Sequence, residues 1–417
     1  MRYRLIAAIA AVTALFVCCS KNPSVPETSA DPSANPSEEP SLDPEFDPLS
    51  EPEATGHFVI LSWSDIVYVK DAAWKYKLLV DGGFNTYLGW YGTYAEVEES
   101  LTCADEAGLS LIISSPELES DTEATVKLMC KHKSLAGYHI KDEPEVNDFS
   151  YLAKRINDIT KYDDEHPCYV NIYPNWAWGG EVTYRRRVDM YLDRVPVKYL
   201  SFDCYPIKKI DGKNQVRSDW YHGLEDIRGA AKDHNMPFWA FALALGHATN
   251  EATYEIPTIG DLRLQQFSNL VYGATGFQYF TTWGIIHDDG ATNVYYDVKR
   301  VNEELIGLEP VFYGADVIDV WHTGETIPTG TKALQDLPDG IKKIETSDEG
   351  AVVSYIKNGG RQYIALVNKS CIGGMDLTIE FDEGVTARKV TKQSKFEEFE
   401  PGTIRIPAGD IAIYTWK

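Results

Sequence analysis

Eight short apolar runs alternate with amphipathic stretches between residues 57 and 310. The runs lie at 57–65, 83–92, 109–117, 136–144, 167–175, 197–206, 236–246 and 274–284. Helical patterns occur at 94–107, 121–132, 148–161, 183–193, 219–234, 261–272 and 294–307. A continuous apolar run indicates a strand buried on both faces, and strands that alternate with helices indicate a parallel sheet. Eight such units in about 250 residues predict a (β/α)₈ TIM barrel over 57–310.

A doubly wound open sheet is the alternative arrangement for alternating strands and helices. Such a sheet often holds a phosphate group in a glycine-rich loop after its first strand. The run at 57–65 is followed by no loop of that kind. The barrel is therefore the favoured fold.

From about residue 311 the pattern changes to short strands. Residues 351–370 read as two strands around Asn358, Gly359 and Gly360, which is the composition of a tight hairpin turn. Further short runs lie at 375–381, 385–391, 403–406 and 411–416. We expect a small antiparallel, sandwich-like β-domain over 311–417 that caps the barrel, with a sugar-binding module as the alternative.

The first nineteen residues have the features of a secretion signal. Arg2 and Arg4 precede an apolar stretch at 5–17, which is too short to span a bilayer comfortably. Because the stretch ends in two cysteines, the segment resembles a bacterial lipoprotein signal with Cys19 as the lipidated residue. An ordinary secretory signal is the alternative. The pattern predicts an anchor in the bacterial outer membrane, on the cell surface or the periplasmic face.

Residues 20–56 contain eight prolines, nine acidic residues and one lysine. The segment has no apolar face to bury, and its charges repel one another. We therefore expect a disordered, extended tether between the anchor and the barrel.

The net charge and the aromatic content limit the classes of molecule that the protein can bind. The 417-residue chain has a net charge of -24, which argues against nucleic acid because phosphate binding needs a basic surface. Its 10 Trp, 25 Tyr and 15 Phe suit a protein that stacks against sugar faces, although large cores also use aromatic residues. Five cysteines beyond residue 19 show no metal-ligand spacing. We expect a monomer with no cofactor, no catalytic metal and no membrane contact beyond the anchor.

The carboxyl ends of the predicted strands carry the candidate functional residues, since function collects at that end of a parallel barrel. Carboxylates and aromatic residues recur there. The candidate catalytic residues are Glu143 and Asp203, and the candidate substrate-binding residues are Trp63, Asp65, Trp90, Tyr91, Asp142, Asn171, Tyr173, Trp176, Tyr205, His247 and Trp283.

Carboxylates among aromatic residues form the composition of a glycoside-hydrolase site. Two carboxyl groups must flank the scissile bond, one protonated to donate to the leaving oxygen and the other ionised. Poor solvation raises the pKa of a carboxyl group toward the working pH. The pattern predicts cleavage of a poly- or oligosaccharide.

The run at 136–144 ends in Asp142, Glu143 and Pro144. This tripeptide resembles the Asn-Glu-Pro that closes strand four in the large clan of retaining (β/α)₈ glycoside hydrolases. The resemblance implies that Glu143 is the general acid/base and that Asp142 replaces the Asn that contacts the substrate's 2-hydroxyl. The chain is also similar to the barrel lipoproteins of Bacteroides-type bacteria.

The chain departs from that clan at the predicted seventh strand, where the nucleophilic Glu is missing from 236–246. The nearest acids, Glu251 and Glu255, lie in the following loop. Asp203 ends the sixth strand and is the better candidate for the second carboxylate. Asp142 places another charge beside Glu143, which would raise one pKa of the pair and would also suit a cation site.

The missing Glu keeps a second function class open. The barrel could be a non-catalytic carbohydrate-binding protein that kept its cleft and lost its nucleophile. Retaining or inverting chemistry depends on the separation of the two carboxyl groups, about 5–5.5 Å or about 6.5–9.5 Å respectively.

Overall fold

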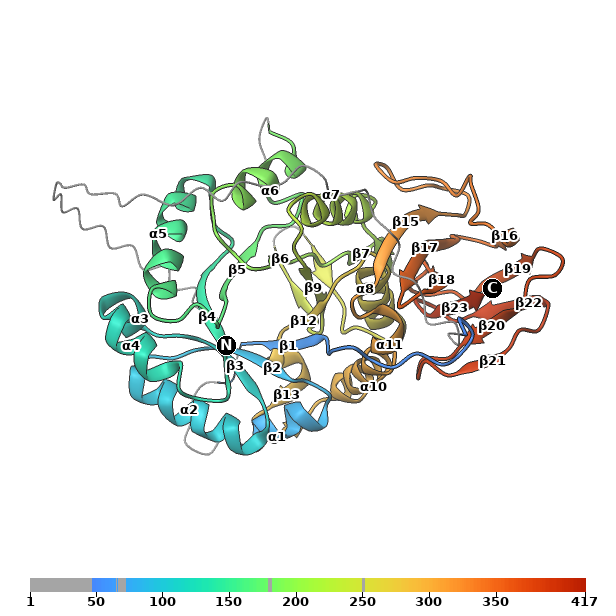
Figure 1. Ribbon diagram of the computed structural model, residues 1–417. Helices are drawn as coiled ribbons and strands as arrows, with labels where there is room; N and C mark the ends of the chain where they lie inside the picture. The colour runs from blue at the N-terminus through green and yellow to red at the C-terminus, as the bar shows by residue number, and fades with distance from the viewer. Residues whose placement is uncertain (1–46, 65, 67–72, 179–181, 250–251) are drawn as a thin grey trace, which may run out of the picture. The chain divides into compact units, whose positions relative to one another are not determined.

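The computed structural model describes residues 47–64, 66, 73–178, 182–249 and 252–417. Eight parallel strands close into a barrel in the order β1-β12-β9-β6-β5-β4-β3-β2 (Figure 1). They are β1 (Val59–Trp63), β2 (Thr86–Trp90), β3 (Ser110–Ser114), β4 (Leu135–Asp142), β5 (Cys168–Ile172), β6 (Leu200–Phe202), β9 (Phe238–Leu243) and β12 (Gly276–Phe280). Each strand overlaps one of the eight predicted runs, so the predicted barrel is confirmed.

Helices cover the outside of the barrel. They are α1 (Ala73–Asp81), α2 (Tyr94–Ala107), α3 (Pro116–Ser120), α4 (Thr122–Met129), α5 (Phe149–Thr160), α6 (Tyr184–Leu192), α7 (Trp220–Asp233), α8 (Ile259–Val271), α9 (Thr282–Ile285), α10 (Asn293–Gly307) and α11 (Glu309–Phe312). The seven predicted helices are all present, whereas α1, α3, α9 and α11 were not predicted. The caps of α2 are typical of such helices, since Thr93 and Glu96 form a capping box and Gly108 ends the helix at φ 76°.

Alternation along each strand separates two apolar layers. Ile60 and Tyr87 pack outward against the helices, while their neighbours Leu61 and Leu88 pack inside the barrel. Tyr169 belongs to the inner layer. Because side chains two residues apart share one face, the strand ends can present polar groups above this inner layer.

Three small hairpins follow the last three barrel strands at the carboxyl end. They are β7 (Ile207–Ile210) with β8 (Lys213–Val216), β10 (His247–Ala248) with β11 (Thr253–Tyr254), and β13 (Ile286–His287) with β14 (Gly290–Ala291). None was predicted, and the first two build walls of the site described below.

The chain beyond the barrel forms two antiparallel sheets, as predicted. The strands are β15 (Asp316–His322), β16 (Ile341–Thr346), β17 (Ala351–Asn358), β18 (Arg361–Asn368), β19 (Met375–Phe381), β20 (Ala387–Val390), β21 (Phe396–Glu398), β22 (Gly402–Ile406) and β23 (Ile411–Trp416). The predicted hairpin joins β17 and β18, and Gly359 and Gly360 make its turn with φ of 53° and 77°. An apolar cluster that includes Val353, Leu366 and Trp416 fills this domain.

The barrel and the β-domain share a hydrophobic core. Val352, Ile356 and Val367 belong to the same apolar cluster as the outer barrel layer. The hydroxyl of Ser354 donates a 2.8 Å hydrogen bond to the carbonyl of Val271 at the end of α8. The predicted boundary at residues 310 and 311 falls inside α11.

Residues 47–56 were expected to belong to the tether, yet part of this segment contacts the β-domain. Asp47 accepts a 2.8 Å hydrogen bond from Lys417, and Glu51 accepts one of 2.7 Å from Lys395. Asp47 and Glu51 are therefore bound to the β-domain and are not part of a free tether. Cys19, Asp65, Glu251, the predicted signal at 1–19 and the predicted tether up to residue 46 lie outside the described residues. In the described part of the chain, no helix is long and apolar enough to cross a membrane.

Candidate active site

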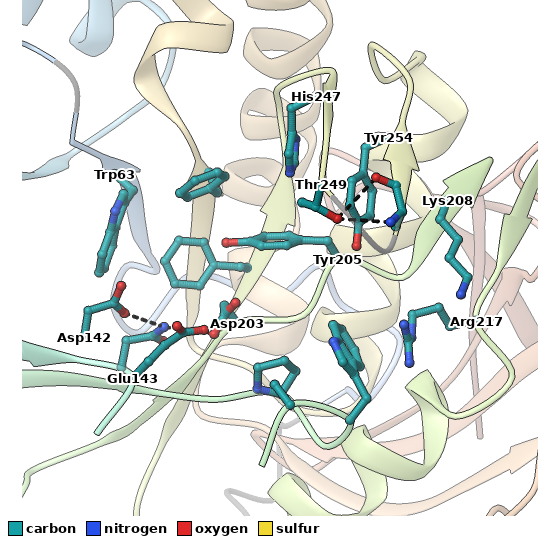
Figure 2. Close-up of a pocket in the computed structure, with 17 residues that line it drawn as sticks. Trp63, Asp142, Glu143, Asp203, Tyr205, Lys208, Arg217, His247, Thr249 and Tyr254 are labelled. Carbon is teal, nitrogen blue, oxygen red and sulfur yellow. Dashed lines mark hydrogen bonds between the residues drawn. The ribbon is translucent and has the colours of Figure 1, made fainter. Parts of the chain in front are cut away.

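A cavity of about 630 Å³ opens at the carboxyl ends of the barrel strands (Figure 2). Strand ends form its floor, and the β7–β8 and β10–β11 hairpins contribute to its walls. Eight of the residues predicted from the sequence line it: Trp63, Asp142, Glu143, Asn171, Trp176, Asp203, Tyr205 and His247. The prediction that functional residues gather at this end is thus consistent with the geometry.

A β-bulge in β4 determines the position of Asp142. The β4–β5 pairing shifts register between His139 and Lys141, so that Asp142 lies opposite Asn171. Without this bulge, Lys141 would take that position, because His139 lies opposite Tyr169. Lys141 instead forms a 3.4 Å ion pair with Asp148.

Glu143 follows β4 in a left-handed backbone conformation, with φ of 48°. Its backbone N–H donates a 2.8 Å hydrogen bond to the carbonyl of Asn171, which keeps the residue attached to β5. Pro144 comes next and cannot donate to a sheet ladder. A β-carbon makes this conformation costly by about 1–2 kcal/mol, so other contacts in the fold must offset the strain at Glu143.

Asn171 of β5 connects two carboxyl groups, which come from the ends of the neighbouring strands β4 and β6. Its Nδ2 donates hydrogen bonds of 3.2 Å to Asp142 Oδ1 and of 3.2 Å to Asp203 Oδ1. Its Oδ1 accepts a 2.9 Å hydrogen bond from Ser201 Oγ, which fixes the direction of the amide. Gln278 Nε2 in turn donates to Ser201 Oγ at 2.9 Å, so the barrel interior supports the arrangement.

The three carboxyl groups share one region at the floor of the cavity, as Figure 2 shows. Burial raises the pKa of Glu143 to about 7, and the nearby charges of Asp142 and Glu145 add to the effect. Burial likewise raises the pKa of Asp142, even though its side chain stays accessible from the open cavity. Asp203 is only 8% exposed, and its burial beside Glu143 and Asp142 raises its pKa well above the ordinary range. Burial and the mutual repulsion of the three groups therefore favour their protonated forms.

His139 was not among the predicted site residues. It lies inside the barrel mouth, where its ring is within 6 Å of the rings of Trp63, Trp90 and Tyr169. Trp90 Nε1 donates a 3.0 Å hydrogen bond to His139 Nδ1, so the proton of the neutral ring is on Nε2. Burial lowers the pKa of His139 to about 3, which keeps the ring neutral. A sequence reading of alternation in β4 could have identified this residue as inward-facing.

Four predicted binding residues do not line the cavity. Tyr91 is buried at 6% exposure with its hydroxyl near that of Tyr76, because it faces outward from the end of β2. Trp90 is 46% exposed and packs on Trp63, which does line the cavity. Trp283 stacks on the ring of His287, and Tyr173 packs near Trp178. The expectation of direct substrate contact is corrected for Tyr91, whose side chain is in the core.

The hairpin walls add residues that the sequence did not single out. Lys208 comes from β7, and Thr249 and Tyr254 come from the β10–β11 hairpin. The ring of Tyr254 stacks on that of His247 at a centroid distance of 4.7 Å. Arg217 follows β8 and lies over the ring of Trp176, with 3.7 Å between its guanidinium carbon and the ring centroid. Their positions depend on hairpins whose placement above the barrel has no local sequence signal.

The loop acids considered as partners of Glu143 differ from Asp203. Glu255 forms an ion pair with Lys209 and lines a separate small cavity. Glu251 lies outside the described residues. The seventh barrel strand, β9, runs into Ala244 and Leu245 and contributes no acid to the cavity. Of the described carboxyl groups that line the main cavity, Asp203 is the one contributed by a strand other than β4.

Within the residues that the structure describes, no group of three or more His, Cys, Asp or Glu side chains is arranged to hold a metal ion. The five cysteines of the described segments are free, and Cys168, Cys204 and Cys371 are buried.

Comparison with known proteins gives relatives in structure only. No family model matches the chain, and no curated protein matches it. Amy13B of Eubacterium rectale superimposes with a TM-score of 0.50 and 11% identity over 88% of this chain and 97% of that chain. A candidate alpha-galactosidase of Bacteroides fragilis NCTC 9343 superimposes with a TM-score of 0.51 and 9% identity over 86% of this chain and 79% of that chain. At these identities the likeness shows a shared fold.

Proposed function

We propose that this chain is a glycoside hydrolase acting on a poly- or oligosaccharide. The observation that carries the proposal is the pair Glu143 and Asp203, two carboxyl groups with raised pKa values that face one aromatic-lined cavity. Tyr205 and the half-buried Trp176 supply aromatic surface on which sugar rings can pack. The description of one structural relative as a candidate alpha-galactosidase also supports a sugar substrate.

Glu143 would act as the proton donor. Its pKa of about 7 leaves much of it protonated near neutral pH, and a group with such a pKa can both give and regain a proton. The proton would pass to the glycosidic oxygen as the bond to the anomeric carbon breaks. The sugar then carries developing positive charge, which an ionised carboxylate stabilises.

Asp203 would be that second carboxylate. Burial raises the pKa of Asp203, but a positively charged sugar would favour the ionised form, as does the hydrogen bond from Asn171. The ionised group would either attack the anomeric carbon or remove a proton from a water molecule. The first route retains the anomeric configuration and the second inverts it, so NMR of the freshly released sugar distinguishes them.

The test is sugar release by the purified protein from a panel of glycans, with Glu143→Gln and Asp203→Asn run in parallel. Both variants should lose nearly all activity. Glu255→Gln is the control, because Glu255 pairs with Lys209 outside the main cavity. Full activity in Asp203→Asn would overturn its role and direct attention to the loop acid Glu251.

The two roles are separable with aryl glycosides that carry good or poor leaving groups. A variant that lacks the proton donor keeps activity toward a good leaving group, which departs without a proton. We expect that pattern for Glu143→Gln and uniform loss for Asp203→Asn. The opposite pattern would mean that Asp203 is the proton donor and Glu143 the second carboxylate.

A non-catalytic carbohydrate-binding barrel is the second candidate. One observation favours it, since β9 contributes no carboxylate to the cavity. A binder would release no sugar from any glycan, and Glu143→Gln would keep most of its affinity.

We also propose that the chain is anchored to the outer membrane through Cys19, on the basis of the two cysteines that end the apolar stretch at 5–17. Metabolic labelling with a radioactive fatty acid tests this. Label that persists in Cys19→Ser would contradict it.

A further inference from the structure

The charges lining the cavity are separated into two groups. Asp142, Glu143 and Asp203 lie at one end, whereas Lys208 and Arg217 lie at the other with Tyr205 between the groups (Figure 2). Cations placed only to balance the acids would contact them directly. The separation indicates that Lys208 and Arg217 have a different function.

Lys208 is a half-buried cation that has no acidic partner among the described residues. It lines the cavity from β7, and no salt bridge or hydrogen bond joins it to any residue in the described segments. The next residue, Lys209, instead pairs with Glu255 away from the cavity. A half-buried lysine with no partner among the described residues is available to an anionic ligand.

Arg217 is held rigidly beside it. Its Nε and Nη2 donate 3.0 Å hydrogen bonds to the two carboxylate oxygens of Asp219, and its plane lies over the ring of Trp176. The side chain is 16% exposed. These contacts use one edge of the guanidinium, and Nη1 donates no hydrogen bond to any of the described residues. Its remaining N–H groups can therefore donate to an oxyanion.

We propose that Lys208 and Arg217 form an anion subsite that binds a carboxylate or sulfate group on the glycan. The substrate class is then an acidic poly- or oligosaccharide. The charged sugar would bind beside the two cations, while a neighbouring sugar lies over Glu143 and Asp203. The cleavage of such a glycan rests on the proposed function, but its binding does not.

The experiment measures binding by calorimetry in the Glu143→Gln background, where the ligand is not consumed. Two matched ligand pairs are used: oligogalacturonate with its methyl ester, and a sulfated galactan oligosaccharide with its desulfated form. We expect at least one acidic member to bind ten or more times more tightly than its neutral counterpart, with affinity that falls as salt increases. The pair that shows the preference identifies carboxylate or sulfate as the recognised group.

Lys208→Met should abolish this preference, and Arg217→Gln should weaken it. Lys209→Met is the matched control, because it removes an adjacent charge that points away from the cavity, and it should leave the preference unchanged. Equal or weaker binding of both acidic ligands would overturn the inference, as would a preference that survives Lys208→Met. A protein that binds acidic glycans through Lys208 but hydrolyses none would overturn the proposed function and leave the subsite standing.

Discussion

Asn171 donates a 3.2 Å hydrogen bond to Asp203, joining the ends of β5 and β6 at the floor of the cavity. The same nitrogen also donates to Asp142, the last residue of β4. One amide therefore sets the positions of carboxyl groups from two other strands. The arrangement suggests that Asn171 is a positioning residue rather than only a substrate contact.

Replacing Asn171 by Ala should lower kcat by about 10- to 100-fold, because each charged hydrogen bond that is lost contributes about 1.5–3 kcal/mol. The pKa of Asp203 should rise further, since the hydrogen bond from Asn171 favours its ionised form. The measurement is the pH dependence of kcat, which a purely structural defect would not shift. Ser201→Ala is the milder comparison, because it leaves both Nδ2 donors in place. An unchanged pH profile in Asn171→Ala would contradict the positioning role.

The pKa of Glu143 predicts the alkaline limb of the activity profile. The protonated form is the donor, so kcat should decline as the pH rises through about 7. The charge of Asp142 raises this pKa, and Asp142→Asn should therefore move the limb to lower pH. The control is Asp148→Asn, whose side chain pairs with Lys141 instead. A limb that stays in place in Asp142→Asn would show that another group controls it.

The sequence was sufficient to predict the barrel, because apolar runs and helical patterns are local signals. Reading only the carboxyl ends of the runs also identified Glu143 and Asp203, which the structure brings to one cavity. The β4 bulge was not visible, since simple alternation would have placed His139, Lys141 and Glu143 on one face. A bulge is a property of the pairing between β4 and β5, so neither strand encodes it alone.

Tyr91 was wrongly predicted as a binding residue because the alternation of side chains was not applied at the end of β2. It follows Trp90, and successive side chains in a strand point to opposite sides, so the two could not both face the cavity. Lys208 and Arg217 were missed for another reason. They lie in a segment between β6 and α7 whose hairpin is defined by pairing within the folded chain, as in Ile207 opposite Val216.

An ion-pair network between the barrel and the β-domain predicts a stability effect. Arg263 of α8 bonds to Glu304 and lies 3.2 Å from Asp410, and Lys392 lies 2.6 Å from Asp410. Arg263 is 14% exposed, so Arg263→Met would leave poorly solvated carboxylates with one cation. We expect a loss of about 3 kcal/mol in the free energy of unfolding, measured by urea denaturation.

The matched control for that network is Arg405→Met. Arg405 pairs with Asp376 on the surface and is 57% exposed, so its removal should cost less than about 1 kcal/mol. Equal losses in the two variants would mean that the buried network adds nothing specific. A single unfolding transition in all the proteins would agree with the core that the barrel and β-domain share.

The backbone of Glu143 gives the last prediction, which links stability to function. Glu143→Ala and Glu143→Gly should both be inactive, because each removes the proton donor. Glycine adopts φ of 48° without strain, so the Gly variant should be more stable than the Ala variant by about 1 kcal/mol. Both should gain stability over the wild type as the pH rises from about 4.5 to about 7, because a raised carboxyl pKa makes ionisation costly in the folded state. Glu145 is the control, since its φ of -83° is ordinary and Gly there should be less stable than Ala. The same order at both positions would mean that the conformation of Glu143 stores no strain, and that its carboxyl group is held at the cavity floor by contacts alone.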